Sequence, residues 1–250
     1  ISGSFYKIAI IDGHRSFVGF DNFKKIFNSK YLLPTLSLTF RYTAFTLFLK
    51  LSLGFITALF LNSDMYFLKV LKFLTLLPWA VQQVAVAVVW KWIFDGNYGY
   101  LNFYLQKIGL LHENISFLSN PTTAFFAASF VDAWLGIPMV AMIFISGLSN
   151  INHSLYESAK IDGAGVFMRF IHITCPCIKR VFFVTVTLVG IWTFNSFNVI
   201  FVLTGGGPMR STETLMLKIY EEAFSKFDLG VAYACCRYFI YIYLYLLFNE

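Results

Sequence analysis

The run "PTLSLTFRYTAFTLFLKLSLGFITALFL", from Pro34 to Leu61, decides the fold class of this chain. It is longer than the ~20 residues that a helix needs to cross a hydrocarbon core of about 30 Å. Lipid cannot satisfy free backbone polar groups, and the alternating ten-residue pattern of a membrane barrel is absent from the sequence. The run therefore predicts a membrane-spanning α-helix.

The whole chain has the composition of a membrane protein. Of its 250 residues, 58% are hydrophobic and 13% are charged, whereas a soluble domain carries about 25% charged residues. Short polar segments separate the apolar runs, and we predict an all-α, polytopic transmembrane helical bundle formed by residues 1–250 as one domain. About five spanning helices are expected, at Pro34–Leu61, Val70–Phe94, Thr123–Leu148, Val181–Leu203 and Val231–Phe248.

Three other classes of site are disfavoured. The formal charge is +6, but the basic residues are scattered, so we expect no nucleic acid as a partner and place these charges beside anionic membrane lipid. The "CPC" of Cys175 to Cys177 lacks a zinc spacing, and no metal site is predicted. No G-x-x-x-x-G-K-[ST] pattern occurs, so the chain carries no P-loop for ATP.

Polar residues within the apolar runs are candidates for a solute path. In the fourth run, Trp192, Asn195, Ser196 and Val199 share one helical arc at 100° per residue. Amide side chains bond sugar hydroxyls and aromatic faces stack on sugar rings, so Trp192, Asn195, Ser196 and Asn198 are candidates.

Three further polar positions have competing interpretations. Asp132 and Trp134 are secondary candidates for the path, and the alternatives are pairing within the bundle for Asp132 and packing for Trp134. For Lys50, packing against a partner helix or reaching the interface is favoured over a substrate role. The Gln82–Gln83 pair is expected to bond to a neighbouring helix.

A polar block, "YESAKIDGAGVFMRFIHITCPCIKR", interrupts the apolar runs between Tyr156 and Arg180. We interpret residues 149–180 as a cytoplasmic loop of two short helices that forms a compact protrusion. Gly163 permits a sharp bend between the helices, and Pro176 ends or redirects the second helix. Glu157 offers a carboxylate to a basic residue on a docking partner, and Ala159 leaves room for that partner.

The spacing of this block resembles the EAA motif, E-A-A-x3-G-x9-I-x-L-P, of the membrane subunits of binding-protein-dependent ABC importers. Glu157, Ala159, Gly163, Ile173 and Pro176 fit the motif, and Ser158 and Cys175 are departures from it. Segments including "FVGFDNF", "DAWLGIPMVAMIFISGLSNI", "IWTFNSFNVIFVLTGGGP" and "STETLMLKIYEEAFSKFDLGVAYA" look like the maltose and glycerol-3-phosphate permeases, the carbohydrate-importing branch. That family has about six spanning helices, so this chain is expected to be a fragment that begins after the first.

The resemblance implies partners and roles. It implies a second, related permease, a cytoplasmic ATPase dimer that holds ATP and Mg, an extracytoplasmic solute-binding protein and a sugar, in a bacterial plasma (inner) membrane, while this chain binds no cofactor. The ATPase would dock on Glu157, Ser158, Ala159, Asp162, Gly163, Ile173 and Pro176. The fourth run would line the sugar site, and the irregular turn Gly205, Gly206, Gly207 and Pro208 would face the binding protein.

Two rival functions stay open at this point. A membrane-embedded enzyme would need acids, bases or metal ligands that converge on one membrane face. The histidines, however, are dispersed at His14, His112, His153 and His172. A passive channel or an assembly scaffold would need no ATPase at all.

Overall fold

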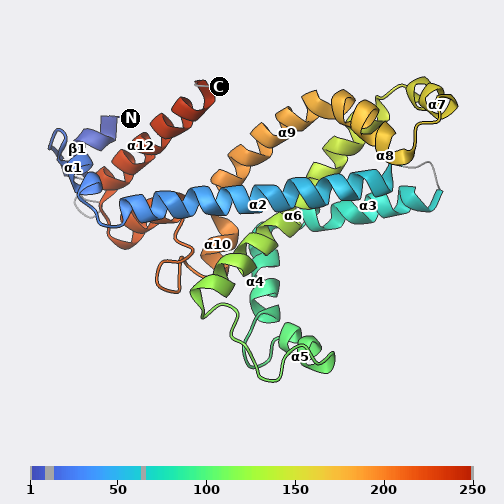
Figure 1. Cartoon of the computed structure of the whole chain (residues 1–250). Coiled ribbons are helices and arrows are strands. Elements are labelled where there is room, and N and C mark those ends of the chain that lie inside the picture. The colour runs from blue at the N-terminus through green and yellow to red at the C-terminus, as the bar shows by residue number, and fades with distance from the viewer. Residues whose placement is uncertain (1, 9–13, 63–65, 249–250) are drawn as a thin grey trace.

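The computed structural model describes residues 2–8, 14–62 and 66–248, and most of them are helical (Figure 1). The helices and strands, in chain order, are η1 (Ser2–Phe5), β1 (Tyr6–Ile8), β2 (Arg15–Phe17), α1 (Asp21–Phe27), α2 (Leu32–Leu61), α3 (Tyr66–Ala80), α4 (Gln83–Ile93), α5 (Tyr100–Lys107), α6 (Pro121–Ser149), α7 (His153–Ile161), α8 (Val166–Arg169), η2 (Phe170–Thr174), α9 (Cys175–Phe194), α10 (Asn198–Leu203), α11 (Leu215–Tyr220), η3 (Glu221–Ser225) and α12 (Leu229–Phe248).

Three helical segments of the described residues are long and apolar enough to cross a membrane: Leu32–Leu61, Pro121–Ser149 and Val166–Leu203. They confirm the first and third predicted spans, and they contain the fourth. The predicted fifth span forms α12, but the side chains of residues 242–248 lie outside the description, so its crossing stays a prediction.

The second predicted span, Val70–Phe94, is wrong as a single straight helix. The chain turns by 91° between Val70–Ala80 and Gln83–Ile93, so this pair is either a broken span or a re-entrant loop. Gln82 has an extended backbone, with φ −60° and ψ 131°. Pro78 lies in the last turn of α3, where its ring weakens the helix just before the break.

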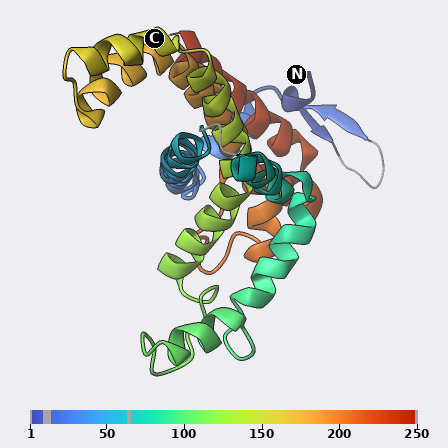
Figure 2. The same cartoon turned by 90° about the vertical axis from the view of Figure 1, so that its right-hand side faces the viewer.

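Helices α2 and α6 form the centre of the molecule and cross closely, as Figures 1 and 2 show. Gly54 on α2 permits this approach, because a Cβ there would lie 2.5 Å from Val140 Cγ1 on α6. Small residues allow helices to pack backbone to backbone in membranes. Phe144 of α6 is fully buried in the same region and contacts Phe55 of α2 ring to ring at 5.1 Å.

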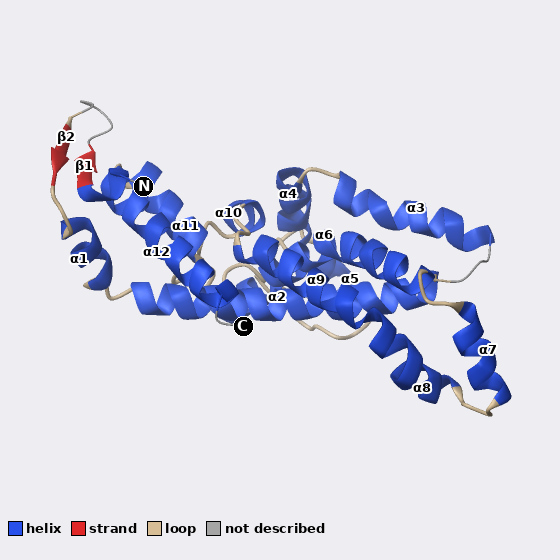
Figure 3. Cartoon of the chain, turned by 90° about the horizontal axis from the view of Figure 1, so that it is seen from above, coloured by secondary structure: helices blue, strands red, loops and turns tan. Residues whose placement is uncertain are grey.

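The N-terminal residues form a small structure that the sequence did not predict. Strands β1 and β2 pair antiparallel, with Tyr6 opposite Phe17 (Figure 3). Asn22 of α1 ties this hairpin to the helices, because its amide donates to the carbonyl oxygens of Ser4 and Tyr6 at 2.9 and 3.0 Å. The residues that join the two strands, 9–13, lie outside the description.

Candidate solute cavity and coupling surface

A cavity of about 230 Å³ lies where α4 begins, where α6 passes its middle and where α9 gives way to α10. It exists because the fourth predicted span is interrupted. Helix α9 ends at Phe194, and α10 starts only at Asn198. Asn195 closes α9, with its side-chain amide donating to Ile191 O at 2.7 Å. The break therefore places consecutive polar side chains beside a cavity.

Most of the predicted path residues meet in this cavity. Its lining includes Asp132, Trp192, Asn195, Ser196 and Asn198. Trp192 is 50% exposed, so one ring surface is available for stacking. The structure therefore brings together five predicted side chains from two helical segments.

Trp79 and Gln83 also line the cavity, although neither was predicted as part of the path. Trp79 comes from the last turn of α3, and Gln83 from the first turn of α4. Gln83 Oε1 accepts from Asn198 Nδ2 at 3.0 Å, which confirms for Gln83 the expected bond to a neighbouring helix. The sequence signal was the "LLPWAVQQ" stretch, but its place in the cavity follows from the 91° turn.

Trp134 does not line this cavity. Its indole packs edge to face against Trp90 of α4, with centroids 5.7 Å apart, beside an apolar cluster formed by α4, α6 and α10. Trp134 is two residues from Asp132 on a helix, so the two side chains point about 200° apart. Trp134 therefore packs within the bundle, as one of the two interpretations expected, and it does not line the candidate path.

Lys50 and Asp132 form a buried ion pair at one wall of the cavity. Lys50 Nζ on α2 lies 3.0 Å from Asp132 Oδ1 on α6, and it also donates to Thr193 Oγ1 on α9 at 3.0 Å. The hydroxyl of Tyr42 donates to the second carboxylate oxygen, Oδ2, at 3.1 Å. The expectation that Lys50 packs against a partner helix is confirmed, and Asp132 pairs within the bundle.

This ion pair has two consequences for the cavity. It joins α2, α6 and α9 through one ammonium group. It also means that the only cation and the only carboxylate among the described lining residues neutralise each other. The groups that remain to contact a solute are amides, a hydroxyl and tryptophan rings.

The predicted coupling residues lie on and beneath a protrusion at one end of the bundle, formed by α7, α8 and η2 (Figure 1). Gly163 bends the chain between α7 and α8 with a φ of +76°, a conformation in which other residues are strained. Glu157, Ser158, Asp162 and Gly163 are exposed, and Ala159 is half-buried. This face of the protrusion is therefore accessible on the described part of the chain.

The base of the protrusion is anchored in the helical bundle. Ile173 packs against the apolar cluster that contains Phe144, and the Tyr156 hydroxyl bonds to Thr174 Oγ1 at 2.9 Å. These contacts join α7 to η2, which runs directly into α9. A displacement of the protrusion would therefore reach α9 and the cavity that its far end lines.

Pro176 does not end the second helix of the loop, so the first of the two alternatives, that it ends or redirects this helix, was wrong. The helical run continues from Val166 through α9, with Pro176 in the first turn of α9. It follows a π-helical turn, Phe170–Thr174, in which Cys175 N–H donates to Phe170 O. Proline lacks an N–H and is tolerated where the hydrogen-bond pattern changes.

The glycine turn that follows α10 is irregular, as its sequence predicts. Gly205 and Gly206 adopt φ values of +58° and +92°. Thr212 Oγ1 donates to Gly207 O at 2.8 Å and holds the turn closed. Position 206 also favours a residue without a side chain, because a Cβ there would lie 2.7 Å from Leu217 Cδ2.

A group of charged residues lies next to this turn. Glu213 is buried, 3.3 Å from Arg210 and 3.6 Å from Lys218. Burial raises the pKa of the Glu213 carboxyl, and the two cations oppose part of that rise. Sequence reasoning did not single out this cluster, because the sequence alone does not show that Arg210, Glu213 and Lys218 come together.

The sequence and geometry agree with a known family of proteins. Residues 50–249 match the family model of the binding-protein-dependent transport system inner membrane component. The chain belongs to this family. It is therefore a transport permease subunit, built of membrane helices.

Among relatives, a probable ABC transporter permease of Brucella suis is 36% identical over 85% of this chain and 74% of its own length. The trehalose/maltose transport system permease of Thermococcus litoralis is 33% identical over 86% of this chain and 71% of its own length. A bacterial ABC transporter that imports alginate has the same fold, with a TM-score of 0.82, 22% identity and coverage of 91% of this chain and 80% of the other.

Proposed function

We propose that this permease forms one side of the membrane path of a sugar importer, and that the cavity at the α9–α10 break holds the sugar in transit. The observation that carries the proposal is the composition of this cavity. Amides from Gln83, Asn195 and Asn198 meet the ring of Trp192 in a volume of about 230 Å³. One relative, the trehalose/maltose transport system permease, supports the same solute class.

The charge of the cavity favours an uncharged sugar over a phosphate ester. A phosphate would need a cation free to pair with it. Lys50, the one cation among the described residues that line the cavity, already has Asp132 at 3.0 Å and Thr193 at 3.0 Å. Amides and a hydroxyl, by contrast, suit sugar hydroxyl groups, which both donate and accept hydrogen bonds.

Energy for transport would come from other polypeptides. The exposed face of the protrusion, with Glu157 at its centre, suits docking of a cytoplasmic ATPase dimer, which would hold ATP and Mg. Closure of that dimer would push the protrusion and, through Ile173 and Thr174, move α9. The path would then switch between two packed arrangements that open to opposite sides.

The remaining partners follow from the same proposal. A second, related permease would complete the path opposite α9, and a solute-binding protein would deliver the sugar at the Gly205–Pro208 turn. The membrane would be the plasma (inner) membrane of a bacterium, with the protrusion on the cytoplasmic side. The chain itself would carry no cofactor.

The test is sugar uptake by the complex reconstituted with its partner subunits and binding protein. We expect Asn195→Ala to raise the half-saturating sugar concentration about three- to tenfold, the size of one lost hydrogen bond. Asn114→Ala is the control. The Asn114 side chain also makes one hydrogen bond within the chain, accepting from Gln106 Nε2 at 2.8 Å, but it lies outside both the cavity and the protrusion.

A parallel substitution tests stacking. Trp192→Ala should weaken uptake, whereas Trp92→Ala, which removes an exposed tryptophan of α4 outside the cavity, should not. Equal effects of both tryptophan substitutions, together with unchanged kinetics for Asn195→Ala, would reject the cavity as the sugar site. Uptake without ATP would favour a passive channel instead.

A further inference from the structure

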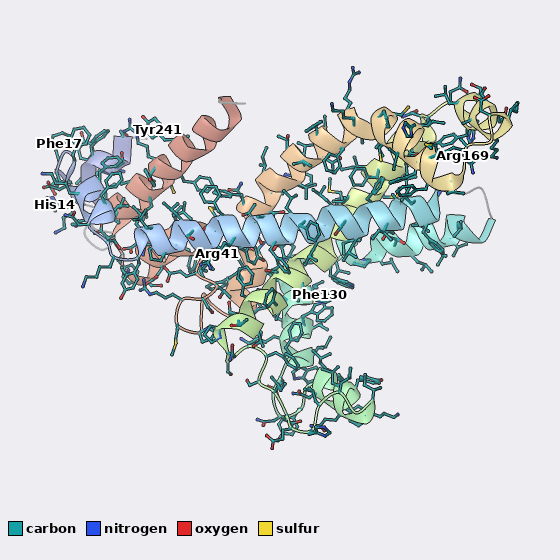
Figure 4. All side chains as sticks on the ribbon, viewed as in Figure 1. His14, Phe17, Arg41, Phe130, Arg169 and Tyr241 are labelled. Atoms are coloured by element: carbon teal, nitrogen blue, oxygen red, sulfur yellow. The ribbon has the colours of Figure 1, made fainter. Side chains whose placement is uncertain are left out.

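A second hollow, on the other side of α2, has a different chemical character from the sugar cavity. It has a volume of about 760 Å³ and lies between the first half of α2, the start of α6 and residues Met209–Ser211. Figure 4 labels Arg41, the basic residue that α2 contributes to it. The proposed transport path does not use this hollow.

Three cations from separate segments converge there: Lys30 before α2, Arg41 on α2 and Arg210 in the loop after α10. Arg210 is held in place by Glu213 at 3.3 Å, by Glu221 at 3.9 Å and by the Tyr31 ring at 3.9 Å, so its charge is already paired and the unpaired cations are Lys30 and Arg41. Among the described residues, no carboxylate lies within ion-pair distance of Lys30 or Arg41. The hollow therefore carries an excess of positive charge.

The orientation of Arg41 places its charge toward the end of the span. Arg41 Nε donates to Ser37 O at 3.4 Å, four residues nearer the helix start. The side chain thus reaches back by about one turn, or ~5 Å, toward Lys30 and Tyr31. Basic side chains in membrane helices extend in this way toward the headgroup level.

The opposite part of the hollow is apolar. Leu38 and Phe45 of α2 face Phe125 and Phe126 of α6, and the Phe45 ring lies 5.2 Å from that of Phe126. Ser211 also lines the hollow, and its hydroxyl is buried without a hydrogen-bond partner. The site thus offers cations at one end and aromatic surface at the other.

We propose that this hollow binds an anionic phospholipid. The headgroup phosphate would lie between Lys30 and Arg41, beside Arg210, with an acyl chain along Phe45 and Phe126. Basic pockets between membrane helices suit anionic headgroups. A free phosphate or a phosphorylated sugar would satisfy the cations but leave the aromatic wall uncovered, and a zwitterionic lipid would leave the charge uncompensated.

The experiment uses the assembled importer in lipid nanodiscs. Phosphatidylglycerol with a photoreactive acyl chain is compared with phosphatidylcholine carrying the same group, and cross-linked peptides are mapped by mass spectrometry. We expect phosphatidylglycerol to label the peptides that contain Phe45 and Phe126. Lys30→Gln with Arg41→Gln should reduce this labelling, by about fivefold in apparent affinity for each charge removed.

The control is Arg15→Gln with Lys107→Gln, which removes the same two charge types from exposed positions outside the hollow. It should leave the labelling unchanged. Equal labelling by phosphatidylcholine, or no effect of the Lys30 and Arg41 substitutions, would overturn the proposal. Complete competition by glycerol-1-phosphate would also overturn it, because that result identifies a free-anion site. So would loss of the second permease when the Lys30 and Arg41 variant is purified, because that result identifies a subunit interface.

Discussion

Lys50 Nζ and Asp132 Oδ1 lie 3.0 Å apart, with side chains only 6% and 9% exposed, between two helices that cross at the centre of the molecule. A buried ion pair is weak evidence for stability, because desolvation offsets the attraction between the charges. Breaking such a pair by removing one partner is costly, however, because an uncompensated charge stays buried. The pair is therefore best tested by single and double substitutions.

We expect Asp132→Asn and Lys50→Met each to destabilise the complex by roughly 3–5 kcal/mol, and the double variant to cost less than the sum. Thermal unfolding of the solubilised complex measures this coupling. The exposed pair Lys24–Asp21, at 3.4 Å, is the control, and its coupling should stay below about 1 kcal/mol. Additive losses at Lys50 and Asp132 would show that the two groups do not interact.

Gly136 provides the space that the Lys50 side chain occupies. A Cβ at this position would lie 2.7 Å from Lys50 Cε, so Gly136→Ala should displace the ammonium group and destabilise the protein by about 1–3 kcal/mol. Gly190→Ala on α9 is the control, because its nearest neighbour, Leu47 Cδ2, lies at an ordinary 3.6 Å. The same melting measurement should show Gly190→Ala neutral or stabilising; equal losses for both would dismiss the steric explanation.

The bend at Gly163 depends on its backbone conformation and not on close packing. Gly163 has a φ of +76°, and nothing lies within 4 Å of a Cβ built there. Gly163→Ala should therefore strain the turn by about 1–2 kcal/mol. Gly165 has equally open surroundings but a φ of −66°, so Gly165→Ala should be harmless. Hydrogen exchange of the α7 and α8 amides would detect the difference, and identical exchange in both variants would contradict the argument.

Reversal of charge at Glu157 tests the docking role of the protrusion. Glu157→Lys should leave the protein inserted and folded, because the side chain is exposed, but should abolish stimulation of the ATPase by the loaded binding protein. Glu113→Lys makes the same change at an exposed position outside the protrusion. Sugar uptake at the wild-type rate by the Glu157 variant, at normal expression, would count decisively against docking at this residue.

Two carboxyl groups outside the spans should respond to pH with opposite signs. Burial raises the pKa of Glu213. The backbone amides of its turn should therefore gain protection from hydrogen exchange as the pH falls through that raised pKa toward the ordinary pKa of 4.5. The backbone N–H groups of Tyr98 and Asn97 lower the pKa of Asp95, so its turn should lose protection below the ordinary 3.8. Glu213→Gln should remove the first response, and a loss of protection there on acidification would reverse our assignment.

The exposed and buried parts of the candidate site differed in how well the sequence predicted them. The Glu157–Gly163 spacing indicated a bent protrusion because a glycine with positive φ and a polar block are local features. The sequence also identified Asn195, Ser196 and Asn198 as a polar stretch in an apolar run. It did not predict that Trp79 and Gln83 join them, because that depends on the 91° turn after Ala80.

The sequence by itself determined the class of this protein, since long apolar runs have no stable form in lipid other than helices whose backbone groups are all paired. Only the tertiary structure decided the partners of the polar residues within those helices. Lys50 and Asp132 are far apart in sequence, and either could have faced a solute. Their pairing follows from the close crossing of α2 and α6, which Gly54 and Gly136 permit because neither has a side chain.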